Sequence, residues 1–244
     1  MRNVRLDICY DGSRYKGWQR LTDADNTIQS KLEQTLSRLL GEAIEISGSG
    51  RTDAGTHAMG QVVSFHCESQ MPCDEILSGL RMYLPEDIGV YSCKDVSPRF
   101  HARLNAKEKT YCYRVWNTDD PCVFERRYVH KDVRQFDLSV MQEAANYLVG
   151  THDFSAFCSN KHMKKSTVRA IKSFDIERVG NELRFTVTGN GFLQHMVRIM
   201  VGTLLEIGAG SMEPDRISTL FGQAREASGP AVPACGLCLM EVTY

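Results

Sequence analysis

Residues 26–46 read NTIQSKLEQTLSRLLGEAIEI, and their pattern predicts a helix followed closely by a strand. Asn26 and Thr27 are residues that can cap the start of a helix. The apolar residues at positions 28, 32, 36, 39 and 40 fall on one face of that helix. Gly41 is a natural end for it, and Ile44 and Ile46 alternate with polar residues as in a strand.

The segments around this helix extend the pattern into a fold. The first half of the chain is expected to run strand, helix, strand, strand, helix, strand, at residues 4–8, 28–40, 44–46, 61–67, 74–84 and 88–93. The second half repeats this order with one extra helix, at residues 110–116, 138–148, 168–179, 182–188, 192–207, 214–222 and 237–244. A Gly180-Asn181 turn joins two of these strands as a hairpin.

This order predicts the fold class α+β. We expect two β-α-β-β-α-β halves, similar to ferredoxin or RRM domains, with antiparallel sheets that join around a central cleft. Pro98 interrupts the pattern between the two halves. We therefore expect domains at residues 1–100 and 101–244.

The composition is typical of a globular protein with a sizeable core, because 42% of the 244 residues are hydrophobic and 24% are charged. No apolar run approaches the ~20 residues of a membrane span, and the N-terminal residues lack the apolar segment of a signal peptide. Nine scattered cysteines favour reduced thiols and a cytoplasmic protein. Cys235 and Cys238 form a C-x-x-C pair, which we interpret as packing residues rather than a metal or redox site.

Net charge gives an ambiguous indication of the partner. The value of −1 and the isoelectric point of about 6.7 argue against a nucleic-acid binder, because the isoelectric point of such domains is usually above ~9. The charge is unevenly distributed, however. Residues 99–134 hold nine basic and five acidic side chains, and residues 161–172 hold five basic and no acidic ones. Local basic surfaces are therefore expected on a nearly neutral chain.

The densest polar cluster is residues 47–58, SGSGRTDAGTHA. Its glycines allow a tight turn and a close approach by a ligand. It lacks the Gly-Lys-Ser/Thr ending of a phosphate-binding loop and is followed by a strand rather than a helix. On these grounds alone it could be an ordinary polar turn in which Asp53 bonds its own backbone.

Residues 50–55, GRTDAG, followed by His57 and Ala58, resemble the signature of the tRNA pseudouridine synthase A family. Further blocks that resemble the family occur in order along nearly the whole chain, at residues 10–12, 15, 17–19, 27–29, 32–33, 100–103, 111–114, 192–202 and 236–244. Thr56 stands where a valine is common in the family, and Cys112 stands where a basic residue is often found. Neither departure removes a catalytic group.

The resemblance implies an isomerase, an intramolecular transferase that converts uridine to pseudouridine at nucleotides 38–40 of the tRNA anticodon stem-loop. It implies no cofactor, no metal and no small-molecule donor. Asp53 matches the family's catalytic aspartate, acting on a base flipped out of the RNA into the central cleft. Whether its carboxylate attacks C1′, attacks C6 or removes the 2′ hydrogen stays open.

The resemblance also implies substrate-binding roles for three residues. Tyr111 matches the tyrosine that stacks on the target uracil, although Tyr111 and Tyr113 share a strand face and one of them could be core. Arg51 would contact RNA phosphate or fill the space left by the flipped base. Arg198 matches the arginine that pairs with the catalytic carboxylate.

Other residues carry weaker expectations. The candidates for RNA contact are basic residues taken as a set: Arg14, Arg20, Arg103, Lys161, Lys164 and Lys165, with Lys107, Lys109 and Arg114. His57 and His101 are more simply hydrogen-bonded structural residues. The family implies a homodimer, which would help a 27.5 kDa chain to grip a tRNA.

Three alternatives to this function stay open. One is an RNA-binding module without activity, against which the intact Asp53, Arg51, Tyr111 and Arg198 argue. Another is a uridine methyltransferase with a cysteine nucleophile, which would need a donor site that the sequence does not suggest. The third is a pseudouridine synthase that acts outside the anticodon arm.

Overall fold

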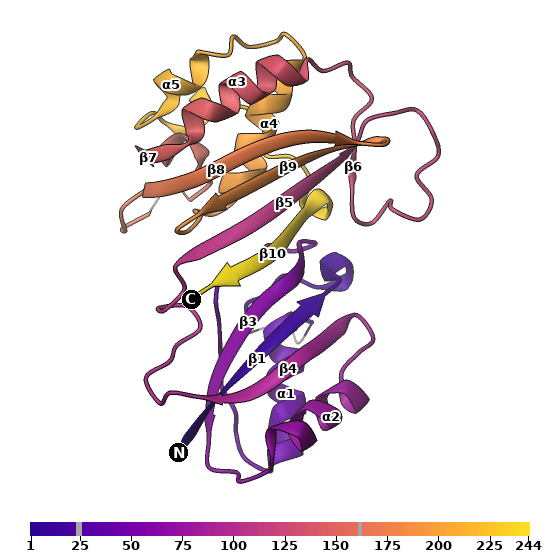
Figure 1. Cartoon of the computed structure of the whole chain (residues 1–244), viewed down its shortest axis with the longest axis vertical. Helices are drawn as coiled ribbons and strands as arrows, with labels where there is room; N and C mark the ends of the chain where they lie inside the picture. The colour runs from indigo at the N-terminus through magenta and orange to yellow at the C-terminus, as the bar shows by residue number, and fades with distance from the viewer. Residues whose placement is uncertain (23–25, 161–162) are drawn as a thin grey trace. The chain divides into compact units, whose positions relative to one another are not determined.

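The structure is a computed structural model that describes residues 1–22, 26–160 and 163–244. It contains two compact units. Residues 1–107 and 238–244 form the first unit, and residues 108–237 form the second. Each unit combines helices with a sheet of several strands (Figure 1). The α+β class predicted from the sequence is confirmed.

The first unit is built on β1 (Arg2–Tyr10), β3 (His57–Cys67) and β4 (Ile88–Val96). β1 lies between the other two and is antiparallel to both. Two further strands, β2 (Ile46–Gly48) and β10 (Leu237–Thr243), pair with β3. The helices α1 (Ile28–Leu40) and α2 (Cys73–Tyr83) pack against each other.

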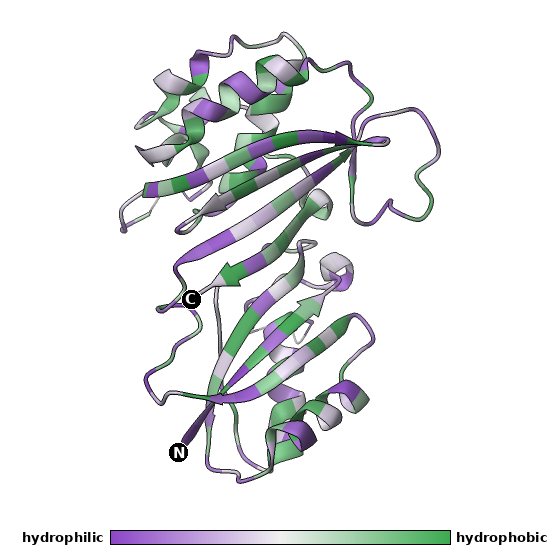
Figure 2. Ribbon diagram, in the orientation of Figure 1, coloured by the Kyte–Doolittle hydropathy of each residue, from purple (hydrophilic) through white to green (hydrophobic). Residues whose placement is uncertain are grey.

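Local sequence accounts for these elements. The Thr27 hydroxyl caps α1 by accepting a hydrogen bond from the Ser30 amide at 3.2 Å, and Gly41 ends the helix with a φ of 71°, as predicted. Alternate residues of β1, from Val4 to Tyr10, are buried. Figure 2 shows this alternation as bands of colour along the strands of the sheet.

The second unit is built on β5 (Glu108–Trp116), β9 (Glu182–Gly189), β8 (Val168–Val179) and β7 (Gly150–Asp153), in that order across the sheet. All these neighbours are antiparallel, whereas the short β6 (His130–Lys131) pairs with β5 in parallel. The helices α3 (Leu138–Leu148) and α4 (Met196–Gly208) pack together over this sheet, and α5 (Arg216–Leu220) packs against α3 (Figure 1). Single 3-10 turns lie at Gly12–Arg14, Ser155–Phe157, Arg225–Ala227 and Ala234–Gly236.

Several details differ from the sequence-based expectations. The long apolar helix begins at Met196 rather than Phe192, because His195 takes a left-handed φ of 60°. The strand β10 pairs with β3 in parallel, not antiparallel. The units divide after Lys107, and the C-terminal strand belongs to the first unit, whereas the expected linear division was 1–100 and 101–244. The pairing of β10 with β3 joins segments that are far apart in the sequence, so no local sequence pattern predicts it.

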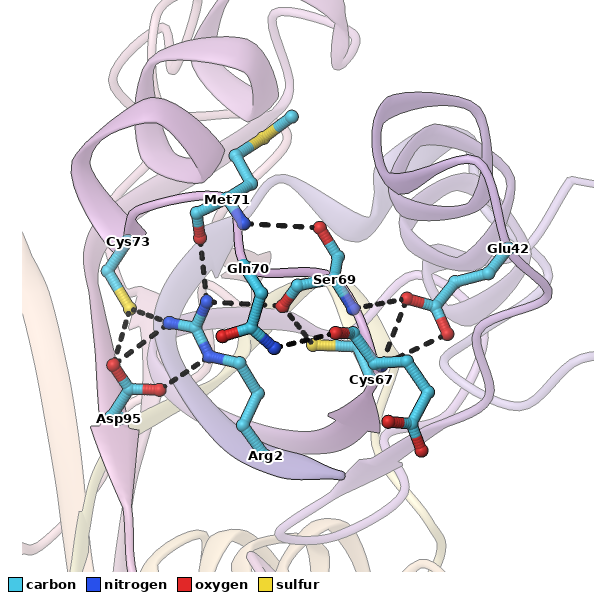
Figure 3. A network of polar contacts seen from close by, with 9 residues as sticks. Arg2, Glu42, Cys67, Ser69, Gln70, Met71, Cys73 and Asp95 are labelled. Atoms are coloured by element: carbon cyan, nitrogen blue, oxygen red, sulfur yellow. Dashed lines mark hydrogen bonds and ion pairs between the residues drawn. The ribbon is translucent and has the colours of Figure 1, made fainter.

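Arg2 anchors the start of the first unit (Figure 3). Its guanidinium binds both carboxylate oxygens of Asp95 on β4, at 2.7 and 2.9 Å. It also donates to the Met71 carbonyl at 2.7 Å and to the Cys73 sulfur at 3.2 Å, at the start of α2. All nine cysteines of the chain are described, and each is a free thiol. Within the described ranges, no helix is long and apolar enough to cross a membrane.

Candidate active site

The loop that carries Asp53 connects β2 to β3 in the first unit. β1 occupies one edge of β3, so β2 and β10 must share the other. β2 pairs with residues 63–65 and β10 with residues 57–58. The loop leaves the sheet along this shared edge. Asp53 is half-buried there, and Arg51 is exposed.

Hydrogen bonds to buried groups fix the first part of this loop. The Ser49 amide donates to the Val62 carbonyl at 2.8 Å, and the Ser49 hydroxyl donates to the side-chain oxygen of Gln61 at 2.5 Å. The Gln61 side-chain amide in turn donates to the Gly50 carbonyl at 3.0 Å. Ser49 and Gln61 are both fully buried. Such a satisfied buried network holds the backbone in one conformation.

The N-terminal segment 10–18 holds the second part of the loop. The Trp18 amide donates to the Thr52 carbonyl at 3.0 Å, and the Tyr10 and Thr52 hydroxyls lie 2.8 Å apart. Gly17 has a φ of +92°, and a Cβ at this position would lie 2.9 Å from the Thr52 carbonyl oxygen. Glycine is therefore required at position 17 for the loop to approach this closely. The sequence pattern alone did not assign this supporting role to segment 10–18.

His57 anchors the end of the same loop. The residue is 5% exposed, and its Nδ1 accepts a hydrogen bond from the Gly12 amide at 3.1 Å. The same nitrogen lies 3.2 Å from a carboxylate oxygen of Asp11. This geometry supports the structural role expected for His57.

The two tyrosines of β5 are both buried in the second unit, Tyr113 completely and Tyr111 almost completely. Both side chains lie on the same strand face, as their spacing requires. Tyr113 is fully buried and donates its hydroxyl to the Pro233 carbonyl at 2.8 Å. Burial raises its pKa well above the ordinary value, with nearby Arg198 acting in the opposite direction. Tyr113 is therefore a core residue. Tyr111 is 7% exposed and meets the ring of Phe192 edge-on, with 5.1 Å between ring centroids.

Arg198 lies in the first turns of α4, among residues that are mostly buried. Its own side chain is half-buried. The Nε donates to the Val232 carbonyl at 2.7 Å, and the Val232 amide returns a bond to the Arg198 carbonyl at 3.3 Å. These bonds hold the guanidinium close to the helix instead of letting it extend into water.

The candidates for RNA contact fall into two groups. Arg14 binds Asp87 at 2.5 and 2.8 Å, and Arg20 binds Glu33 at 2.8 Å. Since these partners neutralise part of their charge, both arginines are weaker candidates for binding phosphate. The second group consists of exposed side chains and holds Arg103, Lys164 and Lys165. Lys161 lies outside the described residues.

Metal and cofactor sites were not expected from the sequence. In the parts of the chain that the structure describes, no group of three histidine, cysteine or acidic side chains could hold a metal ion. Cys235 and Cys238 direct their thiols to the backbone carbonyls of Val129 and Leu239, at 3.4 and 3.8 Å.

Comparison with known proteins identifies the class. A family model described as tRNA pseudouridine synthase matches residues 8–105 and 144–244. The chain is 44% identical to tRNA pseudouridine synthase A 1 of Clostridium tetani (strain Massachusetts / E88) over 245 residues. It is 43% identical to tRNA pseudouridine synthase A of Bacillus sp. (strain KSM-64) and 41% identical to tRNA pseudouridine synthase A 2 of Bacillus cereus (strain ZK / E33L). Each alignment covers 100% of both proteins.

A solved structure, the archaeal box H/ACA sRNP Nop10-Cbf5 complex, aligns with a TM-score of 0.36 at 13% identity, over 83% of this chain and 44% of that one. The sequence relatives define the class: this α+β protein is an RNA-modifying enzyme. The chain belongs to the tRNA pseudouridine synthase family, and it isomerises uridine to pseudouridine in tRNA.

Proposed function

We propose that the enzyme acts on uridines 38–40 of the anticodon stem-loop and that Asp53 is its catalytic group. The observation that carries this proposal is the loop around Asp53. It presents one half-buried carboxylate on a backbone fixed by Trp18 and by the buried pair Ser49 and Gln61. A catalytic group must be held to within a fraction of an ångström, and such a loop meets that requirement.

The chemistry needs one carboxylate and no exchange of atoms with a donor. The bond from N1 of uracil to C1′ breaks, and a bond from C5 to C1′ forms after the base has turned. C5 loses its proton to solvent, and N1 gains one. A carboxylate can assist by attacking C1′ or C6, or by removing the 2′ hydrogen. The proposal assigns Asp53 to this step without choosing among the three.

Two residues of the second unit are proposed to bind the substrate. Tyr111 would stack on the flipped uracil, since an aromatic face holds an unstacked base. The edge-on contact with Phe192 supports this role by fixing the plane of the Tyr111 ring. Arg198 would pair with the catalytic carboxylate. Its bond to the Val232 carbonyl fixes the position of the side chain in the second unit.

Arg51 is proposed to contact the RNA, because it is exposed two residues before Asp53. The exposed Arg103, Lys164 and Lys165 would bind phosphates around the site. A homodimer, as the family resemblance implies, would give the tRNA a larger surface. We place the reaction in the cytoplasm as part of the same proposal, because nine free thiols favour a reducing compartment.

The remaining alternative is a synthase that acts outside the anticodon arm. Mapping of pseudouridine in tRNA from cells that lack the protein separates the two. We expect pseudouridine to disappear at one or more of nucleotides 38–40 and to return when the gene is restored. Loss at another tRNA position, with 38–40 unchanged, would replace the proposed target.

A further inference from the structure

Arg169 is a charged residue that the proposed site does not yet use. It lies near the start of β8, in the second unit, and its side chain is half-buried. Its Nη1 donates to the carbonyls of Ser166 and Val168, at 3.0 and 2.6 Å. Among the residues that the structure describes, no carboxylate pairs with it. Burial lowers its pKa, and Cys158 acts in the opposite direction.

Three other arginines of this unit each have a carboxylate partner. Arg114 binds Glu182 at 2.5 Å, Arg134 binds Asp132 at 2.7 Å, and Arg184 binds Glu182 at 3.1 Å. A half-buried guanidinium without a counter-ion is costly. The half-buried guanidinium of Arg169 therefore points to an anion that another molecule supplies.

The free side of this guanidinium faces a glycine. Nη1 is occupied by the two carbonyls, and no bond of Nε or Nη2 is found within the described part of the chain. A Cβ at Gly191 would lie 3.7 Å from Nε, so a side chain there would cover this edge. Nε and Nη2 together form the planar fork with which arginine binds a phosphate through two hydrogen bonds.

The same segment leads to the proposed base-binding residue. Gly191 precedes Phe192, whose ring meets Tyr111 at 5.1 Å. Asn190 ties this segment to β8, because its amide donates to the Ala170 carbonyl and its side-chain oxygen accepts from the Ala170 amide, both at 3.0 Å. Arg169 and Phe192 are therefore held in a fixed relation.

The sheet order sets the separation between Arg169 and Tyr111. β8 and β5 lie on either side of β9, which places them ~10 Å apart. The two residues are also displaced along the strand direction. Ile171, Gly189 and Lys109 lie side by side across the three strands. Arg169 lies beyond this row toward one end of the sheet, and Tyr111 lies beyond it toward the other end. A base on Tyr111 and a phosphate on Arg169 would therefore belong to different nucleotides.

We propose that Arg169 binds a backbone phosphate of the RNA next to the target nucleotide, through its Nε and Nη2. The proposal rests on the proposed function, because it takes Tyr111 as the residue under the target base. The lack of acidic residues between 161 and 172, and the exposed Lys164 and Lys165 in that segment, fit an RNA strand that runs past this site.

The test compares Arg169→Gln with Arg169→Lys and with Arg178→Gln as a matched control. Arg178 lies at the other end of β8 and donates to the Asn117 side chain at 2.8 Å. Affinity for an anticodon stem-loop RNA is measured by fluorescence anisotropy over a range of salt. We expect Arg169→Gln to weaken binding about tenfold and to reduce the slope of log affinity against log salt by roughly 0.7–0.9, the value of one phosphate contact. Arg169→Lys should keep most of the slope, and Arg178→Gln should match wild type.

A second measurement locates the phosphate. Single phosphates within two nucleotides of the target uridine are replaced by uncharged methylphosphonates. One replacement should weaken wild-type binding and leave Arg169→Gln unaffected. Additive losses at every phosphate, or an unchanged salt slope with a lowered melting temperature, would show that Arg169 only supports the Ser166 and Val168 backbone. Pseudouridine formation by wild type in the same RNA is measured separately. If wild type forms no pseudouridine in this RNA, the proposed function is wrong. If no single methylphosphonate weakens wild type while leaving Arg169→Gln unaffected, the proposed phosphate contact of Arg169 is wrong.

Discussion

Replacement of Gly17 by alanine should damage the active site from a position that contributes no functional group. Gly17 has a φ of +92°, a conformation that costs an L-residue roughly 1–2 kcal/mol. Its new methyl group would also lie 2.9 Å from the Thr52 carbonyl oxygen and 3.1 Å from the Ala54 amide. The backbone on both sides of Asp53 must therefore move, and overpacking of this kind adds about 1–3 kcal/mol.

Gly41→Ala provides the matched control. Gly41 has a φ of +71°, and nothing lies within 4 Å of a Cβ there. This variant should lose roughly 1–2 kcal/mol of stability from backbone strain alone, with unchanged turnover. Gly17→Ala should lose about 2–5 kcal/mol from strain and overpacking together. Its turnover should fall about tenfold, given that a ~1 Å displacement of a reacting group costs on the order of 100-fold.

The two variants are compared by urea unfolding and by release of tritium from tRNA labelled at C5 of uridine. Both are assayed at a temperature at which each remains folded. Equal turnover in the two variants would refute the reasoning, because it would mean that the contact between Gly17 and the loop does not position Asp53.

Three further predictions concern single contacts. Among the described residues, the buried Thr56 hydroxyl has no hydrogen-bond partner, so Thr56→Val should raise the free energy of unfolding by about 1 kcal/mol in urea titrations. Tyr111→Ala should abolish turnover and leave the salt dependence of tRNA binding unchanged, whereas changing Lys164 and Lys165 to glutamine should flatten this salt dependence. A flattened salt dependence in Tyr111→Ala, with none in the double lysine variant, would contradict both assigned roles. Burial raises the pKa of the Glu182 carboxyl, but its two arginine partners bring the net value below the ordinary one. Glu182 therefore stabilises the fold above the ordinary pKa of glutamate, and this contribution is lost as pH falls through the lower folded-state value. Glu182→Gln should unfold with a weaker acid dependence than wild type.

Local sequence was sufficient for elements whose determinants are close together. The helix Ile28–Leu40 has its cap at Thr27 and its end at Gly41, both readable within one stretch. The hairpin of β8 and β9 follows from its Gly180-Asn181 turn. The short strands β6 and β7 were not expected, because two and four residues are too few to show a period.

Long-range contacts were beyond the reach of sequence patterns. The partner of Arg14 is Asp87, 73 residues away, so its charge looked available for RNA. The parallel pairing of β10 with β3 is likewise invisible to a linear division into domains. Strand alternation placed Tyr111 and Tyr113 on one face but could not separate them, because the hydroxyl acceptor of Tyr113 is Pro233, far along the chain.

The central claim is that the Asp53 carboxylate performs the isomerisation at nucleotides 38–40. The direct measurement is pseudouridine formation at each of these nucleotides by purified wild type and Asp53→Asn, in a single turnover with excess enzyme. Asparagine keeps the size of the side chain and removes the charge. We predict pseudouridine with wild type and none with Asp53→Asn, at equal melting temperature and equal tRNA affinity. Turnover by Asp53→Asn above a trace of the wild-type level would contradict the account.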